Sequence, residues 1–293
     1  MSFNKTIKNN KESNNMKILL DTTKKDLIPR VSIVMPTLNE EDYLKNSIDC
    51  IIKNDFDLDL IELIIIDSSS IDRTIEIIKE YSYKISIKLI LAPSYSVYQA
   101  LNLGLENARG EFFLRVDARS LLPFDYIKKS LQHLRNTNIK CVGGRQVQFG
   151  ITKKSKAIAA VTNSFIGTGG AKFRISKNSG PADSVYLGVY KINYLRHLNG
   201  FEDSSRCVSE DSYINYKIRK NGYLVFLDAS LEVKYPAKTT FKALANQYLI
   251  YGAGRYFIYK KHNALTSYRQ IIPLLFLGAI SLLSIFSLIS VYS

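Results

Sequence analysis

The chain has 293 residues, of which 46% are hydrophobic, and it carries 40 Lys and Arg against 26 Asp and Glu. This length allows one large α/β domain or two small ones, and the hydrophobic content excludes a disordered chain. The net charge of +14 is accompanied by no helix-turn-helix, RNA-binding aromatic signature or Cys/His finger, so we expect no nucleic-acid partner.

The N-terminal part of the chain changes character near residue 30. Residues 1–29 are polar and contain no apolar run, which predicts a flexible N-terminal tail and no signal peptide. Residues 31–36 form a short apolar run that is typical of a buried strand. Asn39 is predicted to cap the next helix, because the three acidic residues that follow it suit the positive end of a helix dipole.

Strands and helices then alternate through the first half of the chain. The expected strands are residues 63–67, 88–91 and 112–117, and the expected helices are one that carries Ile71, Ile75 and Ile78 and one over residues 97–108. Alternation at this interval predicts βαβ units and a mostly parallel sheet, which is the α/β class.

Polar side chains follow several of these strands. Thr37 and Asn39 come after the first, Asp67 after the second and Asp117 after the fourth. Each alone could be an ordinary cap or turn residue, but a ligand crevice at the carboxyl ends of the strands explains all four together. No GxGxxG follows the first strand, and the glycine-rich run at residues 167–172 is not a P-loop, so the usual phosphate-binding signatures are absent from the sequence.

The last 23 residues, 271–293, carry no charge. This length suffices for a transmembrane helix, although a buried core helix or a monotopic segment stays open. Lys260, Lys261 and Arg269 precede the segment, and the positive-inside rule places that side in the cytoplasm. We therefore expect a cell-membrane protein with a single C-terminal span and a cytoplasmic catalytic domain.

The surplus of positive charge lies in two runs that contain no acidic residue. Residues 126–182 carry eleven basic side chains, and residues 236–270, a basic juxtamembrane segment, carry six. The first run could face anionic lipid headgroups or a polyprenyl diphosphate, or it could simply be a solvated face. In the second run, tyrosines interleave with basic residues as in an interfacial helix.

Four motifs, in order, resemble family 2 glycosyltransferases of the GT-A fold: VSIVMPTLNEEDYL, ELIIIDSSSIDRT, ALNLGLENARGEFFLRVDAR and GFEDSSRCVSEDSYINYKIRKNGY. The runs RVDAR, SGPADSVYLGVY and YGAGRY resemble the succinoglycan-biosynthesis glucosyltransferase branch. The resemblance implies a GT-A domain over residues 30–235, with a nucleotide-sugar half (30–125) and an acceptor half (126–235). It also implies inverting transfer of a sugar from a nucleotide donor to a lipid-linked saccharide acceptor, in surface polysaccharide or glycolipid biosynthesis.

The same resemblance implies roles for individual residues. Asp67 takes the place of the acid that accepts a uracil N–H, which implies a UDP-sugar, while Thr37 and Asn39 line the base and ribose. Asn102 matches a position beside the donor, although it also fits an ordinary mid-helix residue. On the acceptor side, Asp211 is the expected catalytic base, and the acceptor-binding residues are Asp183, Arg206 and Glu210, although Arg206 also fits an ordinary solvated arginine. Glu210 and Asp211 also suit the first turn of a helix, and both interpretations can hold together.

The departing diphosphate needs positive charge, from a metal ion or from fixed cations. The family's DxD motif reads Asp117-Ala118-Arg119 here, with a basic third residue. Either Asp117 binds Mg²⁺ or Mn²⁺ with waters completing the shell, which we favour, or Arg119 supplies part of the charge. Two other functions stay open: a polyprenyl-phosphate sugar synthase, and a catalytically silent assembly partner that binds nucleotide-sugar.

Overall fold

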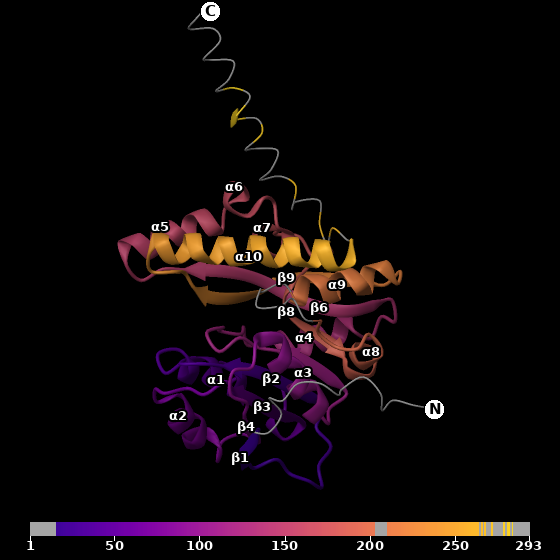
Figure 1. Ribbon diagram of the computed structural model, residues 1–293. Helices are drawn as coiled ribbons and strands as arrows, with labels where there is room; N and C mark the ends of the chain where they lie inside the picture. The colour runs from indigo at the N-terminus through magenta and orange to yellow at the C-terminus, as the bar shows by residue number, and fades with distance from the viewer. Residues whose placement is uncertain are drawn as a thin grey trace, which may run out of the picture. The chain divides into compact units, whose positions relative to one another are not determined.

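The structure is a computed structural model that describes residues 16–202 and 210–263, together with positions 265, 267, 271, 278, 280, 281 and 283 (Figure 1). The chain divides into two compact units. Unit 1 comprises Met1–Lys128 and Val189–Gly200, and unit 2 comprises Lys129–Gly188 and Phe201–Ser293. Unit 1 is therefore formed by two separate segments of the chain, and residues 129–188 between them belong to unit 2.

Unit 1 is built on a parallel sheet whose central strand is β2. The strands, in chain order, are β1 (Lys17–Asp21), β2 (Val31–Thr37), β3 (Ile61–Asp67), β4 (Ile87–Leu91) and β5 (Phe112–Arg115). β2 pairs in parallel with β3 and β5, and β3 pairs in parallel with β4. The last residues of β8 (Tyr186–Lys191) run antiparallel to β5. Every residue of β3 is buried, as expected for a strand covered on both faces.

Short helices connect these strands, and the α/β prediction is confirmed. They are α1 (Leu44–Ile52), the 3₁₀ turn η2 (Leu58–Leu60), α2 (Thr74–Tyr81), α3 (Val97–Asn107) and α8 (Ile192–His197). Leu44, Ile48 and Ile51 give α1 a fully buried stripe at helical spacing.

Two expectations about the N-terminal part of the chain are wrong. Residues 17–21, assigned to a flexible tail, form β1, which pairs antiparallel with β4. β1 is a five-residue edge strand that stays partly exposed, so its apolar pattern is weak and backbone pairing holds it. Asn39 does not cap a helix, because α1 begins only at Leu44 and the residue at its N-cap position is Tyr43.

Gly104 sets how closely α3 approaches β2. A Cβ built on Gly104 would lie 2.3 Å from Cγ1 of Val34, which is completely buried. We expect Gly104→Ala to lower the free energy of unfolding by about 1–3 kcal/mol, because an extra methyl group overpacks the core. Denaturant unfolding would measure this.

The matched control is Gly252→Ala. Gly252 also lies inside a helix, but a Cβ there meets nothing within 4 Å. This variant should gain up to about 1 kcal/mol from helix propensity. A Gly104→Ala protein as stable as the Gly252→Ala protein would contradict the packing argument.

Unit 2 contains the parallel pair β6 (Ile139–Phe149) and β9 (Leu224–Pro236), with the short β7 (Gly180–Pro181) antiparallel to β9. Its helices are α5 (Lys153–Thr162), α6 (Phe165–Thr168), α7 (Lys172–Ile175), α9 (Glu210–Lys220) and α10 (Phe241–His262), while α4 (Tyr126–His133) crosses the boundary between the units. α5 and α10 pack together through a small core of Ile158, Ala159 and Ala237, against which Leu244 lies.

The predicted C-terminal span, residues 271–293, lies outside the described residues except for five isolated positions. Among the residues that the structure describes, no helix is both long and apolar enough to pass through a bilayer.

Candidate active site

Asp67 is the centre of the polar cluster at the carboxyl edge of the unit 1 sheet. Its side chain is completely buried at the end of β3. Oδ1 accepts hydrogen bonds from the backbone N–H groups of Ser69 (3.0 Å) and Ser70 (2.8 Å), and Oδ2 accepts from the hydroxyls of Ser70 (2.6 Å) and Thr37 (3.0 Å). A carboxylate offers about four acceptor positions, so the loop itself uses all of them. A nucleobase N–H would have to replace one of these donors, and the Ser70 hydroxyl can rotate away most easily.

Asn39 fastens the loop after β2 to the loop after β3. Its backbone N–H donates to the Ser70 hydroxyl (2.9 Å), and its side-chain oxygen accepts from the N–H of Ile71 (2.9 Å). Asn39 adopts a φ of +54° and Ser69 a φ of +79°, in the left-handed region that non-glycine residues rarely occupy. Such conformations persist where the surrounding contacts hold them, and they cluster at ligand sites. The structure thus brings Thr37, Asn39 and Asp67 together, as the strand pattern predicted.

Asp117 and Arg119 follow β5 at the same edge of the sheet, and each is engaged in an ion pair. Asp117 accepts from Arg115 Nε at 3.0 Å. Arg119 Nε donates to Glu40 Oε2 at 2.7 Å, and its guanidinium lies 5.0 Å from the centre of the Tyr43 ring. Because Glu40 directly follows Asn39, this pair joins the DAR motif to the Asn39–Asp67 cluster.

Glu40 is the residue of this site that the sequence analysis missed. Burial raises the pKa of its carboxyl above the ordinary 4.5, although the Arg119 partner acts in the opposite direction, and the nearby Asp117 and Asp72 raise it further. Glu40 therefore lies close to two further carboxylates and to one guanidinium. The only signal in the sequence was the acidic run after Asn39, which also suits a helix start.

The raised pKa of Glu40 makes a contribution to stability that depends on pH. Above pH 4.5 the unfolded chain loses this proton first, so the folded state binds more protons and the free energy of unfolding falls as pH rises. We expect the stability of the wild type relative to Glu40→Gln to decrease from pH 4.5 upward, until the folded carboxyl is ionised. Urea unfolding of both proteins over a pH series measures this; an increase would mean that the Arg119 ion pair outweighs burial.

A divalent cation would have Asp117 as its protein ligand at this edge. No group of three or more His, Cys, Asp or Glu that could hold a metal ion exists within the described ranges. Mg²⁺ commonly takes one or two carboxylates and completes its shell with waters and substrate phosphates, so Asp117 alone fits a cation brought with a diphosphate. It does not form a cage that would hold the ion by itself.

The described residues that the sequence predicts for the acceptor side, Asp183, Glu210 and Asp211, lie in unit 2. Glu210 and Asp211 occupy the first turn of α9, where Glu210 is 1% exposed and Asp211 is half-buried. Asn215 lies four residues after Asp211, on the same face of the helix, and donates to the hydroxyl of Ser184 at 3.1 Å. This bond places the segment that carries Asp183 beside the middle of α9. Arg206 lies outside the described residues.

Asn102 has a different environment from the other predicted donor residues. A Cβ added to Gly200, whose φ is +66°, would lie 2.4 Å from Asn102 Oδ1, so this side chain lies against the turn after α8. Arg196 of α8 also donates to the carbonyls of Leu105 and Ala108. These contacts give Asn102 a structural environment between α3 and the turn that follows α8.

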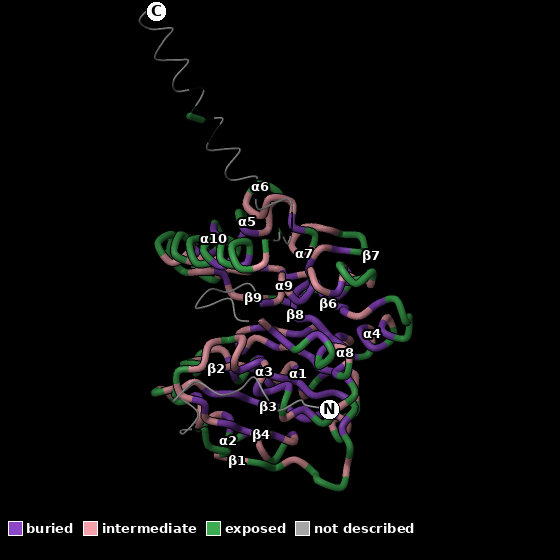
Figure 2. Tube along the Cα trace, turned by 45° about the vertical axis from the view of Figure 1, so that its right-hand side comes forward, coloured by how far each residue is buried: buried purple, intermediate pink, exposed green. Residues whose placement is uncertain are grey.

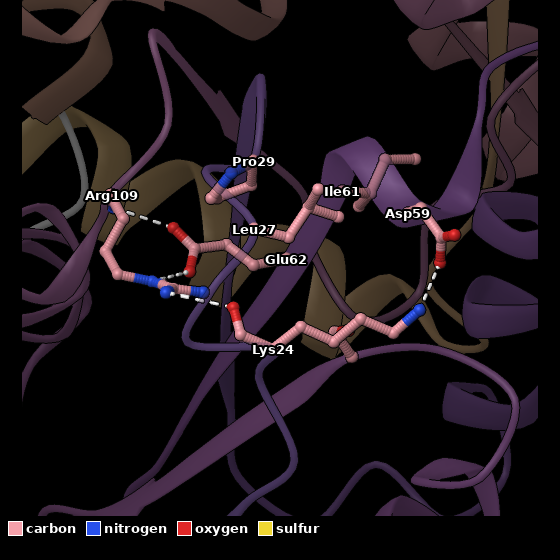
Figure 3. Close-up of a pocket in the computed structure, with 8 residues that line it drawn as sticks. Lys24, Leu27, Pro29, Asp59, Ile61, Glu62 and Arg109 are labelled. Atoms are coloured by element: carbon pink, nitrogen blue, oxygen red, sulfur yellow. Dashed lines mark hydrogen bonds and ion pairs between the residues drawn. The ribbon is translucent and has the colours of Figure 1, made fainter.

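The small pocket in Figure 3 lies at the other edge of the sheet, near the start of β3. The Glu62 carboxylate, 1% exposed, accepts from Arg109 Nε (3.0 Å) and from the backbone N–H of Arg109 (2.7 Å). Lys24 and Asp59 form a second ion pair at its rim. Ligands in open α/β sheets bind beyond the carboxyl ends of the strands, so we assign this pocket a structural role.

The sequence model described as Glycosyl transferase family 2 matches residues 32–193, which is more than half of the chain. The chain belongs to this family. The resemblance inferred from the motifs is confirmed, and the protein is a glycosyltransferase. The matched region contains Thr37, Asn39, Asp67, Asp117 and Arg119 and ends just after β8.

Two curated relatives cover most of this glycosyltransferase. One is a dolichyl N-acetyl-α-D-glucosaminyl phosphate 3-β-D-2,3-diacetamido-2,3-dideoxy-β-D-glucuronosyltransferase of Methanococcus voltae, 25% identical over 79% of this chain and 74% of that protein. The other is the succinoglycan biosynthesis protein ExoA of Rhizobium meliloti, 27% identical over 83% of this chain and 74% of that protein.

Two solved structures share the GT-A fold with this glycosyltransferase. TarS of S. aureus in complex with UDP has a TM-score of 0.56 at 16% identity, over 78% of this chain and 65% of that chain. The mannosyltransferase PcManGT from Pyrobaculum calidifontis, in complex with GDP-Man and Mn²⁺, has a TM-score of 0.57 at 18% identity, over 87% of this chain and 81% of that chain. This glycosyltransferase thus spans just under two thirds of the TarS chain.

Proposed function

We propose that this glycosyltransferase is an inverting enzyme that moves a sugar from a UDP-sugar to a lipid-linked saccharide in surface polysaccharide or glycolipid biosynthesis. The observation that carries the proposal is the polar cluster at the carboxyl edge of the parallel sheet, which combines buried Asp67, Asn39 and the Glu40–Arg119 pair. UDP as the nucleotide is supported by the solved TarS structures, one with UDP and one with UDP-GlcNAc.

The donor half would hold the nucleotide against the two fastened loops. Thr37 and Asn39 line the base and ribose, and Arg119 lies where a diphosphate would accumulate negative charge. A guanidinium already fixed by Glu40 and Tyr43 costs little reorganisation when that charge develops. A divalent cation, when bound through Asp117 and the diphosphate, supplies further positive charge.

The acceptor half would supply the base. The acceptor hydroxyl loses its proton as it attacks the anomeric carbon, and the carboxylate of Asp211 takes that proton. Asp211 Oδ1 accepts from the N–H of Ser212 at 2.7 Å, which orients the carboxylate at the start of α9. Glu210, Asp183 and Arg206 are proposed to position the acceptor. Attack on the side opposite the departing diphosphate inverts the anomeric centre.

The lipid-linked acceptor is supported by the M. voltae relative, whose name gives a dolichyl-linked sugar phosphate as its acceptor. The uncharged residues 271–293 support a membrane location, with a single C-terminal span and the catalytic domain in the cytoplasm. The test is incubation of the purified full chain with a panel of radiolabelled nucleotide-sugars and a lipid extract. Label in the lipid fraction, with UDP released in equal amount, supports the proposal; no transfer from any donor refutes it and leaves a silent assembly partner.

Arg119→Asp tests whether the Arg119 guanidinium or a metal ion supplies the positive charge that stabilises the departing diphosphate. This variant recreates Asp-x-Asp and removes the guanidinium that Glu40 holds. We expect Mn²⁺ to bind more tightly, because a second carboxylate joins Asp117, and we expect transfer to depend more steeply on Mn²⁺. Calorimetric titration of Mn²⁺ in the presence of UDP measures the first effect. Unchanged Mn²⁺ affinity would show that residue 119 does not face the diphosphate.

A further inference from the structure

Helix α10 is apolar on two opposite faces, and only one of them is covered. Of its 22 residues, Gly254 and Ile258 are the buried ones, on the face that also carries Leu244. The opposite face exposes Leu249 (71%) and Tyr256 (64%). Large apolar side chains that are exposed together often mark a contact surface, and the outer face of α10 carries two of them.

A second exposed apolar group lies next to α10. In α6, Phe165 is 69% exposed and Ile166 is 93% exposed. The hydroxyl of Tyr248 in α10 donates to the carbonyl of Gly167 in α6 at 2.7 Å, which joins the two helices. In Figures 1 and 2, α5, α6 and α10 lie together at one end of unit 2. Because α5 also packs on α10, we refer to α5, α6 and α10 as the docking layer.

The charge of the docking layer has one sign. Residues 126–182 and 236–270 contain no Asp or Glu, so none of these helices carries a carboxylate. Lys242 and Lys260 are 18 residues apart on α10, which is five turns, and therefore flank Leu249 and Tyr256 on the same outer side. On α5 the exposed cations are Lys153, Lys154 and Lys156.

We propose that the docking layer binds the surface of an anionic lipid bilayer. Ile166, Phe165 and Leu249 would enter the boundary between headgroups and acyl chains, and the lysines would contact lipid phosphates, as in interfacial amphipathic helices. A second copy of the chain is the poorer occupant, because a two-fold interface would place lysines opposite lysines. The proposal deepens the proposed function and rests on it, since docking would bring the enzyme to a lipid-linked acceptor.

The chain contains no Trp, which makes single-Trp reporters free of background. We would prepare full-length Ile166→Trp and Leu249→Trp, with Tyr83→Trp as the matched control, because Tyr83 is 79% exposed and belongs to unit 1. Each protein is mixed with phosphatidylglycerol-containing vesicles that carry a nitroxide at the top of the acyl chain, without donor or acceptor. We expect blue-shifted emission and quenching at 166 and 249, at a depth of about 5–10 Å, and neither effect at 83.

The reporter at 166 decides the question, because α6 is far in sequence from residues 271–293. Quenching at 249 alone would mean that the C-terminal segment draws α10 to the bilayer, and it would overturn the docking layer. A blue shift without lipid that grows with protein concentration would instead identify a second copy. Equal quenching with purely zwitterionic vesicles would refute the role of the lysines.

The emission measurement needs no turnover, so the two proposals fail separately. A protein that is quenched at 166 but transfers no sugar refutes the proposed function alone. A protein that transfers sugar to lipid but shows no quenching at 166 refutes the docking layer alone.

Discussion

Asp211→Asn should abolish sugar transfer while UDP binding stays at the wild-type level. The amide keeps the shape of the side chain at the start of α9 but cannot take the proton of an acceptor hydroxyl. Loss of a positioned general base lowers a rate by about 10²–10⁴-fold. Steady-state transfer assays give kcat, and calorimetric titration of UDP gives the affinity for the nucleotide. The Asp67 cluster belongs to unit 1 and Asp211 to unit 2, so we expect kcat to change without a change in UDP affinity.

The matched control for Asp211 is Glu232→Gln. Glu232 is also a carboxylate of unit 2, but it is half exposed on β9 and paired with Arg145. We expect wild-type kcat for this variant. Near-normal turnover of Asp211→Asn would overturn the assignment of the base, and it would favour a polyprenyl-phosphate sugar synthase, whose phosphate acceptor needs no proton removed.

Asp67→Ala should cause the largest loss of stability among the site variants. The substitution removes the acceptor of four hydrogen bonds at a completely buried position, including two from partly buried backbone N–H groups. Each buried donor left without a partner costs about 1–3 kcal/mol, so we expect a loss of about 3 kcal/mol after the loop relaxes. UDP affinity should fall as well, because the loops that line the base are no longer fastened.

Ser70→Ala is the control that separates the two roles of Asp67. It removes one donor of the four and also the acceptor of the Asn39 N–H, so it should cost about 1–2 kcal/mol, while it opens an acceptor position on Oδ2 for a uracil N–H. Urea unfolding and UDP titration of both variants give the answer. If Asp67→Ala unfolds like the wild type, the carboxylate does not organise the loop; if UDP affinity is unchanged in both variants, Asp67 does not contribute to the nucleotide site.

Those parts of the fold that depend on local pattern could be predicted from the sequence. β2, β3 and α3 were foreseen because each contains enough apolar residues at one period to identify it. The grouping of Thr37, Asn39 and Asp67 followed from the same strands, since parallel strands end at one edge. The roles of Asp183, Glu210 and Asp211 stay predictions.

What could not be predicted depends on contacts between distant residues. Glu40 and Arg119 are 79 positions apart in the sequence. No local sequence pattern around either residue predicts that they form an ion pair. The sequence predicts a helix cap at Asn39 because cap residues and left-handed turn residues are of the same types, and only the bond to Ile71 distinguishes them. β1 is an edge strand held by backbone pairing with β4. Backbone hydrogen bonds do not require an apolar pattern of side chains, so the sequence does not predict this strand.

Unit 1 has consequences for synthesis on the ribosome, because it is not continuous in sequence. Its β5 is complete at Arg115, yet the β8 residues that cover the open edge of β5 arrive only with Val189–Gly200. At the usual rate of translation, residues 116–188 take roughly 4–15 s to make. During that interval the nascent chain presents an unpaired, apolar strand edge, which is the feature that chaperones shield and that promotes aggregation. Expression as a fragment that ends at residue 128 would make this exposure permanent.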